Sequence, residues 1–224
     1  MSDPETCIVA GVGPGLGRAL ARRFARADFQ VAMLARDGAR LARIADEIAA
    51  EGGRARGVTA DLTVEADIRA AIGRVRDEMG APSLLIYNAS VWNPTAAMDL
   101  APAAFQRDLF LDVTGALVAA QEVVPAMRTA GHGTLIFTGS GLALTPSLGT
   151  AVPSLATGKA ALRAFAHALA GELAPMGVRV ATVTVAGTIA PGTAFAPERV
   201  ADTFFEVYAN PGEHRAVEVT FTGA

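Results

Sequence analysis

Short apolar runs alternate along this chain with longer stretches whose apolar residues recur every three or four positions. Runs of the first kind are typical of buried strands, and stretches of the second kind are typical of amphipathic helices. The first run includes Cys7 and ends in a cluster of glycines, and helical spacing starts at Leu16. Further runs predict strands over residues 29–35, 55–60, 83–87, 134–138, 178–185 and 216–221.

Helical stripes separate these predicted strands. Apolar spacing predicts helices that begin near residues 16 and 41, one that follows Thr63 as its N-cap, and others over residues 102–127, 155–172 and 198–210. In the long helix 102–127 the residues expected to face inward are Phe105, Leu109, Val113, Leu117 and Val124. This alternation predicts an α/β fold in which a doubly wound parallel sheet of about seven strands carries helices on both faces.

Length and composition fit a single domain over residues 1–224, with 51% hydrophobic residues to build its core. The 19 basic and 22 acidic residues leave a net charge of -3, which gives no electrostatic reason to expect nucleic acid as a partner. No apolar run approaches ~20 residues and no signal sequence is evident, so we expect a cytoplasmic protein without a membrane span. The single cysteine, Cys7, is expected to be a buried strand residue.

The glycine cluster lies where the first predicted strand turns into the first predicted helix. Gly11, Gly15 and Gly17 have the spacing G-x-x-x-G-x-G, with Gly13 between the first two. Residues without Cβ let a backbone approach a phosphate closely, and the N-terminus of a helix offers unpaired N–H donors and a positive dipole end. The stretch therefore predicts a phosphate-binding turn.

Four polar residues follow directly after other predicted strands: Arg36, Asp61, Asn88 and Ser140. In a doubly wound sheet the carboxyl ends of parallel strands meet at one edge, and ligands bind there near the switch in strand order. We therefore expect these side chains to lie around the same ligand as the glycine turn.

With these motifs the chain resembles the short-chain dehydrogenase/reductase family over essentially its whole length. The glycine turn has that family's spacing, Asp61-Leu62 is similar to its Asp-Val or Asp-Leu pair, Asn88-Ala89-Ser90 to its Asn-Ala-Gly, and Ala186-Gly187 to its Pro-Gly. The resemblance implies a Rossmann-type fold and a nicotinamide dinucleotide as cofactor, with Asp61 against the adenine. The implied cofactor-binding residues are Gly11, Gly13, Gly15, Leu16, Gly17, Arg36, Asp61, Leu62, Asn88, Ala89, Lys159 and Gly187.

The end of the second predicted strand indicates which dinucleotide is bound. Members of the family that prefer NAD commonly have an acidic residue where this chain has Ala35, and here Arg36 follows. A guanidinium can pair with a 2′-phosphate, so we expect NADP(H) in preference to NAD(H).

The catalytic residues depart from the family pattern. Lys159, in SLATGKAAL, resembles the family's lysine, but the tyrosine expected four residues earlier is Leu155. In the family that tyrosine exchanges a proton with the substrate oxygen, which leucine cannot do. Ser140 matches the family's serine, and Asp112 occupies the position of its catalytic asparagine. The resemblance therefore implies Ser140 as a substrate-orienting group and Lys159 as a cofactor ligand with a catalytic role. Asp112, which departs from the family's asparagine, is our candidate for a proton relay through water.

These features leave three hypotheses open. The first is an atypical NADP(H)-dependent oxidoreductase that acts on a small carbonyl or alcohol substrate, and the second is an NADP(H)-binding sensor or partner subunit without redox turnover. The third is a non-redox enzyme, such as a cyclase or lyase, that reuses the pocket. The resemblance also implies a homodimer or homotetramer. His132, His167 and His214 do not have the spacing of a metal site, although His214 is a candidate substrate-side group.

Overall fold

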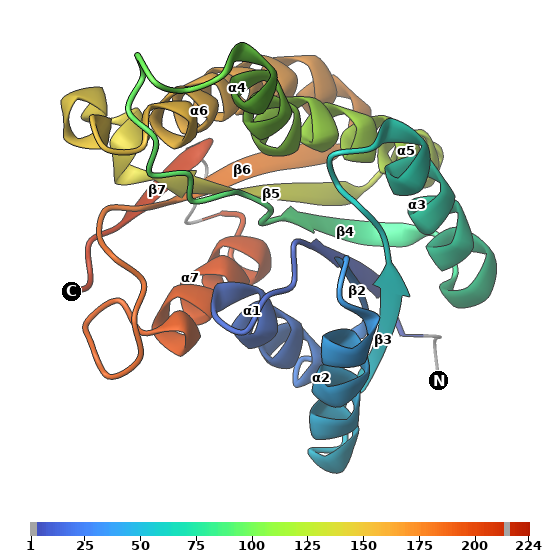
Figure 1. Cartoon of the computed structure of the whole chain (residues 1–224). Helices are drawn as coiled ribbons and strands as arrows, with labels where there is room; N and C mark the ends of the chain where they lie inside the picture. The colour runs from blue at the N-terminus through green and yellow to red at the C-terminus, as the bar shows by residue number, and fades with distance from the viewer. Residues whose placement is uncertain (1–3, 213–215) are drawn as a thin grey trace.

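A seven-stranded parallel sheet forms the centre of the computed structural model, which describes residues 4–212 and 216–224 (Figure 1). The strand order is β3-β2-β1-β4-β5-β6-β7. His214 lies outside the described residues. The strands are β1 (Thr6–Ala10), β2 (Gln30–Ala35), β3 (Arg54–Thr59), β4 (Pro82–Tyr87), β5 (Gly133–Ser140), β6 (Val178–Val185) and β7 (Glu218–Phe221). The predicted α/β fold with a doubly wound parallel sheet is therefore confirmed.

Helices cover both faces of this sheet, and each face has its own apolar core. In Figure 1, α1, α2 and α7 lie below the sheet and α3, α4, α5 and α6 lie above it. The helices are α1 (Leu16–Ala25), α2 (Gly38–Ala50), α3 (Glu65–Met79), α4 (Pro102–Leu109), α5 (Gly115–Ala130), α6 (Pro153–Leu173) and α7 (Pro197–Ala209). A π-helical turn, η1 (Phe110–Thr114), joins α4 to α5, and 3₁₀ turns η2 (Gly141–Ala143), η3 (Pro146–Gly149) and η4 (Ala174–Met176) flank α6.

The middle of the sheet is buried on both faces, as its sequence predicts. Every residue of β1 is buried, including Cys7, and β1 pairs in parallel with β2 on one side and with β4 on the other. The chain runs outward from β1 to β2 and β3, then crosses to β4 and runs outward in the opposite direction. A crevice forms at such a reversal, beyond the carboxyl ends of the two diverging strands.

The N-terminus of α3 differs from the sequence prediction. The N-cap residue is Val64 rather than Thr63, and it provides no side-chain cap. Thr63 instead donates hydrogen bonds from its backbone N and its Oγ1 to Asp61 Oδ1, at 2.9 and 2.7 Å. A short hydroxyl side chain can serve only one such partner, and here the preceding carboxylate takes it.

The buried face of the long helical segment 102–130 also differs from the prediction. Leu117 was expected to face inward, but it is 38% exposed. The positions that are buried follow a spacing close to 3.6 residues, and they include two carboxylates and several small residues: Asp108, Asp112, Ala116, Ala119, Ala120, Val123 and Met127. Residues spaced strictly four apart move progressively off the inner face of a helix, because the helix has about 3.6 residues per turn. The two aspartates also interrupt the apolar pattern by which the inner face would be recognised in the sequence.

The same segment, Pro102–Ala130, is the one helical stretch among the described residues that is long and apolar enough to cross a membrane. Here it covers the upper face of the sheet, where Ala116, Val123 and Met127 belong to the core that includes β4 and β5 residues (Figure 1). Helices that cover a sheet pass the same test of length and composition, so the stretch is weak evidence for a span.

The glycine turn supplies a matched test of the packing between β1 and α1. A Cβ on Gly17 would lie 2.5 Å from Gly11 O and 2.7 Å from Val12 Cα, whereas a Cβ on Gly13 would meet nothing within 4 Å. Because backbone atoms cannot move aside easily, we expect Gly17→Ala to lower the free energy of unfolding by about 1–3 kcal/mol. Gly13→Ala should change it by less than about 0.5 kcal/mol. Urea denaturation measures both, and equal effects would contradict the close approach.

Candidate functional site

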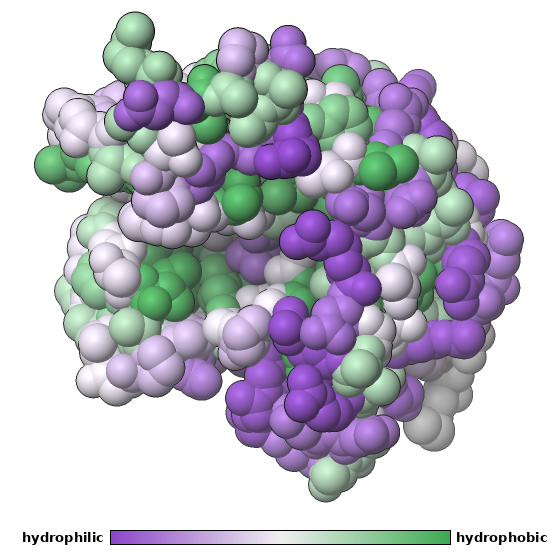
Figure 2. Space-filling view, in the orientation of Figure 1, coloured by the Kyte–Doolittle hydropathy of each residue, from purple (hydrophilic) through white to green (hydrophobic). Residues whose placement is uncertain are grey.

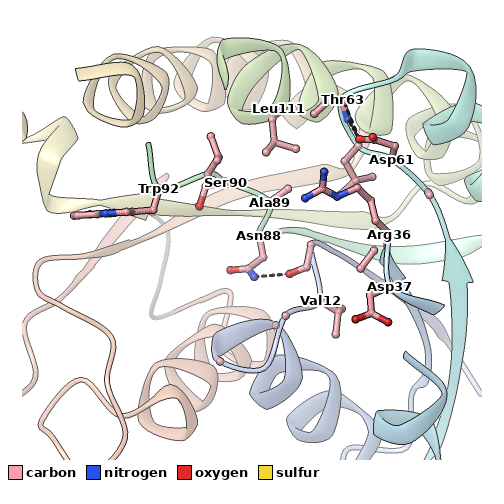
Figure 3. Close-up of a pocket in the computed structure, with 18 of the residues that line it drawn as sticks. Val12, Arg36, Asp37, Asp61, Thr63, Asn88, Ala89, Ser90, Trp92 and Leu111 are labelled. Atoms are coloured by element: carbon pink, nitrogen blue, oxygen red, sulfur yellow. Dashed lines mark hydrogen bonds between the residues drawn. The ribbon is translucent and has the colours of Figure 1, made fainter. Parts of the chain in front are cut away.

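A cavity of about 1030 Å³ lies at the carboxyl ends of the strands, where the strand order reverses (Figure 3). The glycine turn, the end of β2, the loops after β3 and β4, and the α4–η1 segment contribute to its walls. Ten residues expected from the sequence to bind the cofactor line it together: Gly11, Gly13, Gly15, Leu16, Gly17, Arg36, Asp61, Leu62, Asn88 and Ala89. Lys159 and Gly187, the other two, are not among its lining residues.

The glycine turn forms a cradle on one side of the cavity. Gly11 has φ +97°, and a Cβ there would lie 2.5 Å from Ala89 N, so only glycine fits at this crossing. A Cβ on Gly13 or Gly15 would meet nothing within 4 Å, which leaves open space over the part of the turn that faces the cavity. Helix α1 then begins with no side-chain cap and no acidic residue in its first turn. Its N-terminal N–H groups are thus available to an anion, as a dinucleotide pyrophosphate requires.

The Asn88 side chain fixes the floor of the cavity. Its Nδ2 donates to Gly11 O at 2.9 Å, and its Oδ1 accepts from Thr138 Oγ1 at 2.9 Å. These two bonds join the loops after β1 and β4 to strand β5. Asn88 therefore positions the glycine turn, and Figure 3 shows its amide directed at that turn.

Arg36 and Asp61 lie together at one end of the cavity (Figure 3). The pKa of Asp61 is lowered, first by its hydrogen bonds from Thr63 and also by the charge of Arg36. The guanidinium of Arg36 points into the cavity, and no carboxylate of the described residues forms an ion pair with it within 4 Å. Its neighbour Asp37 instead pairs with Arg40 at 3.0 Å, so it does not neutralise Arg36. This end can bind an additional anionic group.

The opposite end of the cavity contains two features that the sequence analysis missed. Trp92 lines the cavity with its side chain largely exposed, and Asp108 lines it although it is buried. The Oδ2 atom of Asp108 accepts from Asn93 Nδ2 and from Ser154 Oγ, both at 2.8 Å. A buried carboxylate needs such donors. The signal for Asp108 was its helical spacing with Asp112, but nothing local predicted its partners on the loop and on α6.

The three residues expected to take part in catalysis lie outside the wall of this cavity. Lys159 is 3% exposed; its Nζ donates to Thr138 O at 3.0 Å and lies 3.9 Å from Asp112 Oδ1. Ser140 ends β5, where its Oγ accepts from Leu142 N at 3.2 Å. Leu155 is half-buried on α6, about one turn before Lys159. The structure thus brings Lys159 and Asp112 together but directs the ammonium group toward the core.

Neither Tyr87 nor Tyr208 lines the cavity. Tyr87 is fully buried in the sheet and donates from its Oη to Leu111 O at 2.6 Å, and burial raises its pKa. Tyr208 packs edge-to-face against Phe24 and Phe29, on the α1 and α7 side of the sheet.

Gly187, after β6, lies against the ring of Phe195. In residues 4–212 and 216–224, no group of three or more His, Cys, Asp or Glu side chains is placed to hold a metal ion.

Asp112 is the most perturbed carboxyl group near the site. It lies in the π-helical turn η1, fully buried, and neither oxygen has a hydrogen-bond partner among the described residues. Desolvation raises its pKa to about 6, although the charge of Lys159 opposes the shift. Burial lowers the pKa of Lys159 in turn. Such buried, partly satisfied charge pairs and π turns are frequent at functional sites.

The raised pKa predicts how Asp112 affects stability. A carboxyl whose pKa is higher in the folded state than in the unfolded chain destabilises the fold progressively as pH rises between the two values, here from about 4 to about 6. Asp112→Asn removes this contribution. The free energy of unfolding of the variant, relative to that of the natural protein, should therefore rise by up to ~3 kcal/mol between pH 4 and pH 6. Urea denaturation at pH 4, 5 and 6 measures the difference. Parallel pH profiles for the two proteins would contradict the shift.

The curated relatives include the cis-2,3-dihydrobiphenyl-2,3-diol dehydrogenases of Pseudomonas sp. strain KKS102, 33% identical over 188 residues and 82% of this chain, and of Pseudomonas putida, 34% identical over 176 residues and 76% of this chain. The matches span 66% and 61% of those proteins, so the chain corresponds to about two thirds of their length.

Solved structures of similar proteins cover the whole fold. A metagenomic short-chain oxidoreductase in complex with NADP has 25% identity and a TM-score of 0.87, over 97% of this chain and 96% of the other. A short-chain type dehydrogenase/reductase from Mycobacterium marinum has 27% identity and a TM-score of 0.89, over 99% and 95%. The profile of the short chain dehydrogenase family matches residues 5–200. This chain therefore belongs to the short-chain dehydrogenase family.

Proposed function

We propose that this protein is an NADP(H)-dependent oxidoreductase that acts on a small carbonyl or alcohol. The observation that carries the proposal is the cavity at the reversal of strand order, with a glycine cradle on one side and, at one end, Arg36, which has no ion-pair partner among the described residues. Family membership and the NADP complex of a similar structure support it. All seven strands of the described residues belong to one sheet, which supports the proposal of a single domain over residues 1–224.

Different residues of the cavity would bind different parts of a dinucleotide. The turn at Gly13 and Gly15, with the start of α1, would hold the pyrophosphate. Asp61 and Leu62 would contact the adenine, and Arg36 would pair with a 2′-phosphate. Asn88 holds the turn in position through Gly11 O. When bound, the dinucleotide supplies a hydride for the carbonyl carbon, and the carbonyl oxygen then needs one proton.

The source of that proton is the atypical part of the proposal. Leucine occupies the position of the family's tyrosine, so Ser140 would orient the substrate oxygen and solvent would deliver the proton. Asp112 is a candidate relay, because its raised pKa keeps a fraction protonated near neutral pH and Lys159 lies beside it. General acid catalysis contributes about 10²- to 10⁴-fold to rates, so a centre without the tyrosine would be slow rather than inactive.

A second function, dinucleotide binding without redox turnover, is favoured by one specific observation. The ammonium group of Lys159 is directed to Thr138 O and Asp112 and does not line the cavity. A sensor or partner subunit needs only the cofactor cradle. A non-redox enzyme that reuses the pocket would likewise keep the cradle and dispense with the tyrosine.

Assembly through the long helices is part of the same proposal. Helix α6 exposes small side chains, and Ala156, Ala160 and Ala161 line a second hollow together with residues of η3. Small residues let helices approach closely. We propose a homodimer or homotetramer built on α4, α5 and α6.

Arg36 tests the cofactor assignment. A charge-assisted hydrogen bond contributes about 1.5–3 kcal/mol, so Arg36→Ala should weaken NADPH binding by about 10- to 100-fold and leave NADH binding within about 2-fold. Arg43→Ala is the matched control, because this exposed arginine on α2 does not line the cavity. Fluorescence titration with each dinucleotide gives the dissociation constants. Tighter binding of NADH than of NADPH by the natural protein would overturn the assignment.

Leu155 tests the reacting end. Leu155→Tyr restores the hydroxyl at the position of the family's tyrosine and should raise NADPH-dependent reduction of aldehydes, ketones or quinones by up to about 100-fold. Leu155→Phe is the control, because it adds the ring without the hydroxyl and should give no gain. Loss of NADPH absorbance measures the rate. If the tyrosine variant folds and binds NADPH but gains nothing, Leu155 does not occupy the reacting position; tight binding by the natural protein without any turnover would instead favour the sensor.

A further inference from the structure

Trp92 is an exposed aromatic side chain in an unusual place. It is 69% exposed, yet it lines the main cavity rather than lying on an outer face. Figure 3 shows its indole at the end of the cavity opposite to Arg36 and Asp61. A tryptophan left open to solvent forgoes the burial of a large apolar surface, about 150–250 Å². An exposed aromatic in a cavity is therefore a candidate contact for a ligand.

The loop that carries Trp92 is fixed to the protein core. The adjacent Asn93 donates to the buried carboxylate of Asp108, which also accepts from Ser154 of α6, both at 2.8 Å. Thr95 Oγ1 closes the loop by donating to Asn93 Oδ1 at 2.8 Å. Because Asn93 bonds to Asp108 of α4, which also accepts from Ser154 of α6, the backbone next to Trp92 is fixed before any ligand arrives. Such preorganisation lowers the entropy that binding costs.

Apolar residues line the cavity between its two ends. Ala89 and Leu111 lie between Trp92 and the end with Arg36 and Asp61 (Figure 3), Val91 lines the same cavity, and Figure 2 shows hydrophobic surface along the hollow between the upper and lower layers. The charged residues Arg36, Asp37 and Asp61 are at the other end (Figure 3). A polar dinucleotide suits the charged end, and a flat apolar ring suits the end with the indole.

We propose that Trp92 determines substrate specificity by stacking on a flat aromatic ring of the carbonyl or alcohol substrate. The inference rests on the proposed function and adds the class of substrate to it. Offset or edge-to-face contact between two aromatic rings contributes about 0.5–1.5 kcal/mol beyond the apolar area that it buries. A saturated ring of similar size gains the area but not this contribution, so the aromatic preference identifies the indole.

The experiment compares benzaldehyde with cyclohexanecarbaldehyde, using NADPH and four forms of the protein. We expect Trp92→Leu, which keeps apolar bulk without a π face, to lower kcat/KM for benzaldehyde by about 3- to 10-fold and to leave cyclohexanecarbaldehyde within about 2-fold. Trp92→Phe should retain most of the benzaldehyde activity. Met98→Ala is the control, because Met98 belongs to the same loop and is 95% exposed but does not line the cavity. The NADPH dissociation constant should be the same in all four.

Three results would overturn the proposal. Equal losses on both aldehydes would make the indole an ordinary apolar wall, and weaker NADPH binding by Trp92→Leu would place it against the dinucleotide. A change in sedimentation coefficient with Trp92→Leu would make it a contact between protein chains. If no form reduces any aldehyde, the proposed function fails separately. Calorimetric titration of the NADP⁺-saturated protein with benzyl alcohol and cyclohexylmethanol then tests the role of Trp92. The proposed stacking is wrong if Trp92→Leu binds benzyl alcohol as tightly as the natural protein does.

Discussion

The structure depends on the close crossing of two backbone segments where the strand order reverses. Gly11 passes so near to Ala89 that a Cβ would lie 2.5 Å from its nitrogen, and the Asn88 amide fixes the crossing through Gly11 O and Thr138 Oγ1. This contact closes the sheet between β1 and β4 and at the same time forms the floor of the cavity. Packing and ligand binding therefore both require a residue without a side chain at Gly11, since a larger residue there would displace the β4 loop and the floor of the cavity together.

Two buried aspartates on one helical face impose a second constraint. Asp108 receives hydrogen bonds from Asn93 and Ser154, so its carboxylate is satisfied and ties the Trp92 loop to α6. Asp112, one turn later, has no hydrogen-bond partner among the described residues and only the charge of Lys159 at 3.9 Å. Burying such a pair gives little net stability, because desolvation opposes the attraction. A well-packed apolar pair would hold these elements as firmly, which points to a role for Asp112 and Lys159 other than stability.

The sequence could predict the fold and one end of the site because the signals are local. Strand runs, the glycine spacing and polar residues at strand ends each depend on a few neighbouring positions, and parallel topology brings Arg36, Asp61 and Asn88 to one edge. Long-range contacts were not predictable in this way. Asp61 takes the Thr63 hydroxyl away from α3, Lys159 turns to Asp112, and the inner face of the long helix carries charges that no apolar periodicity reveals.

The difference between local signals and long-range contacts explains why the sequence is more informative about cofactor binding than about catalysis. The proposed dinucleotide cradle would use backbone N–H groups, glycines and one strand-end arginine, so it persists as long as the β1–α1 turn and the sheet persist. The proposed reacting end would instead require side chains from β5, α6 and the loop after β4 to converge. Leu155 lies half-buried on α6, and Trp92 in the loop after β4 offers an exposed aromatic surface.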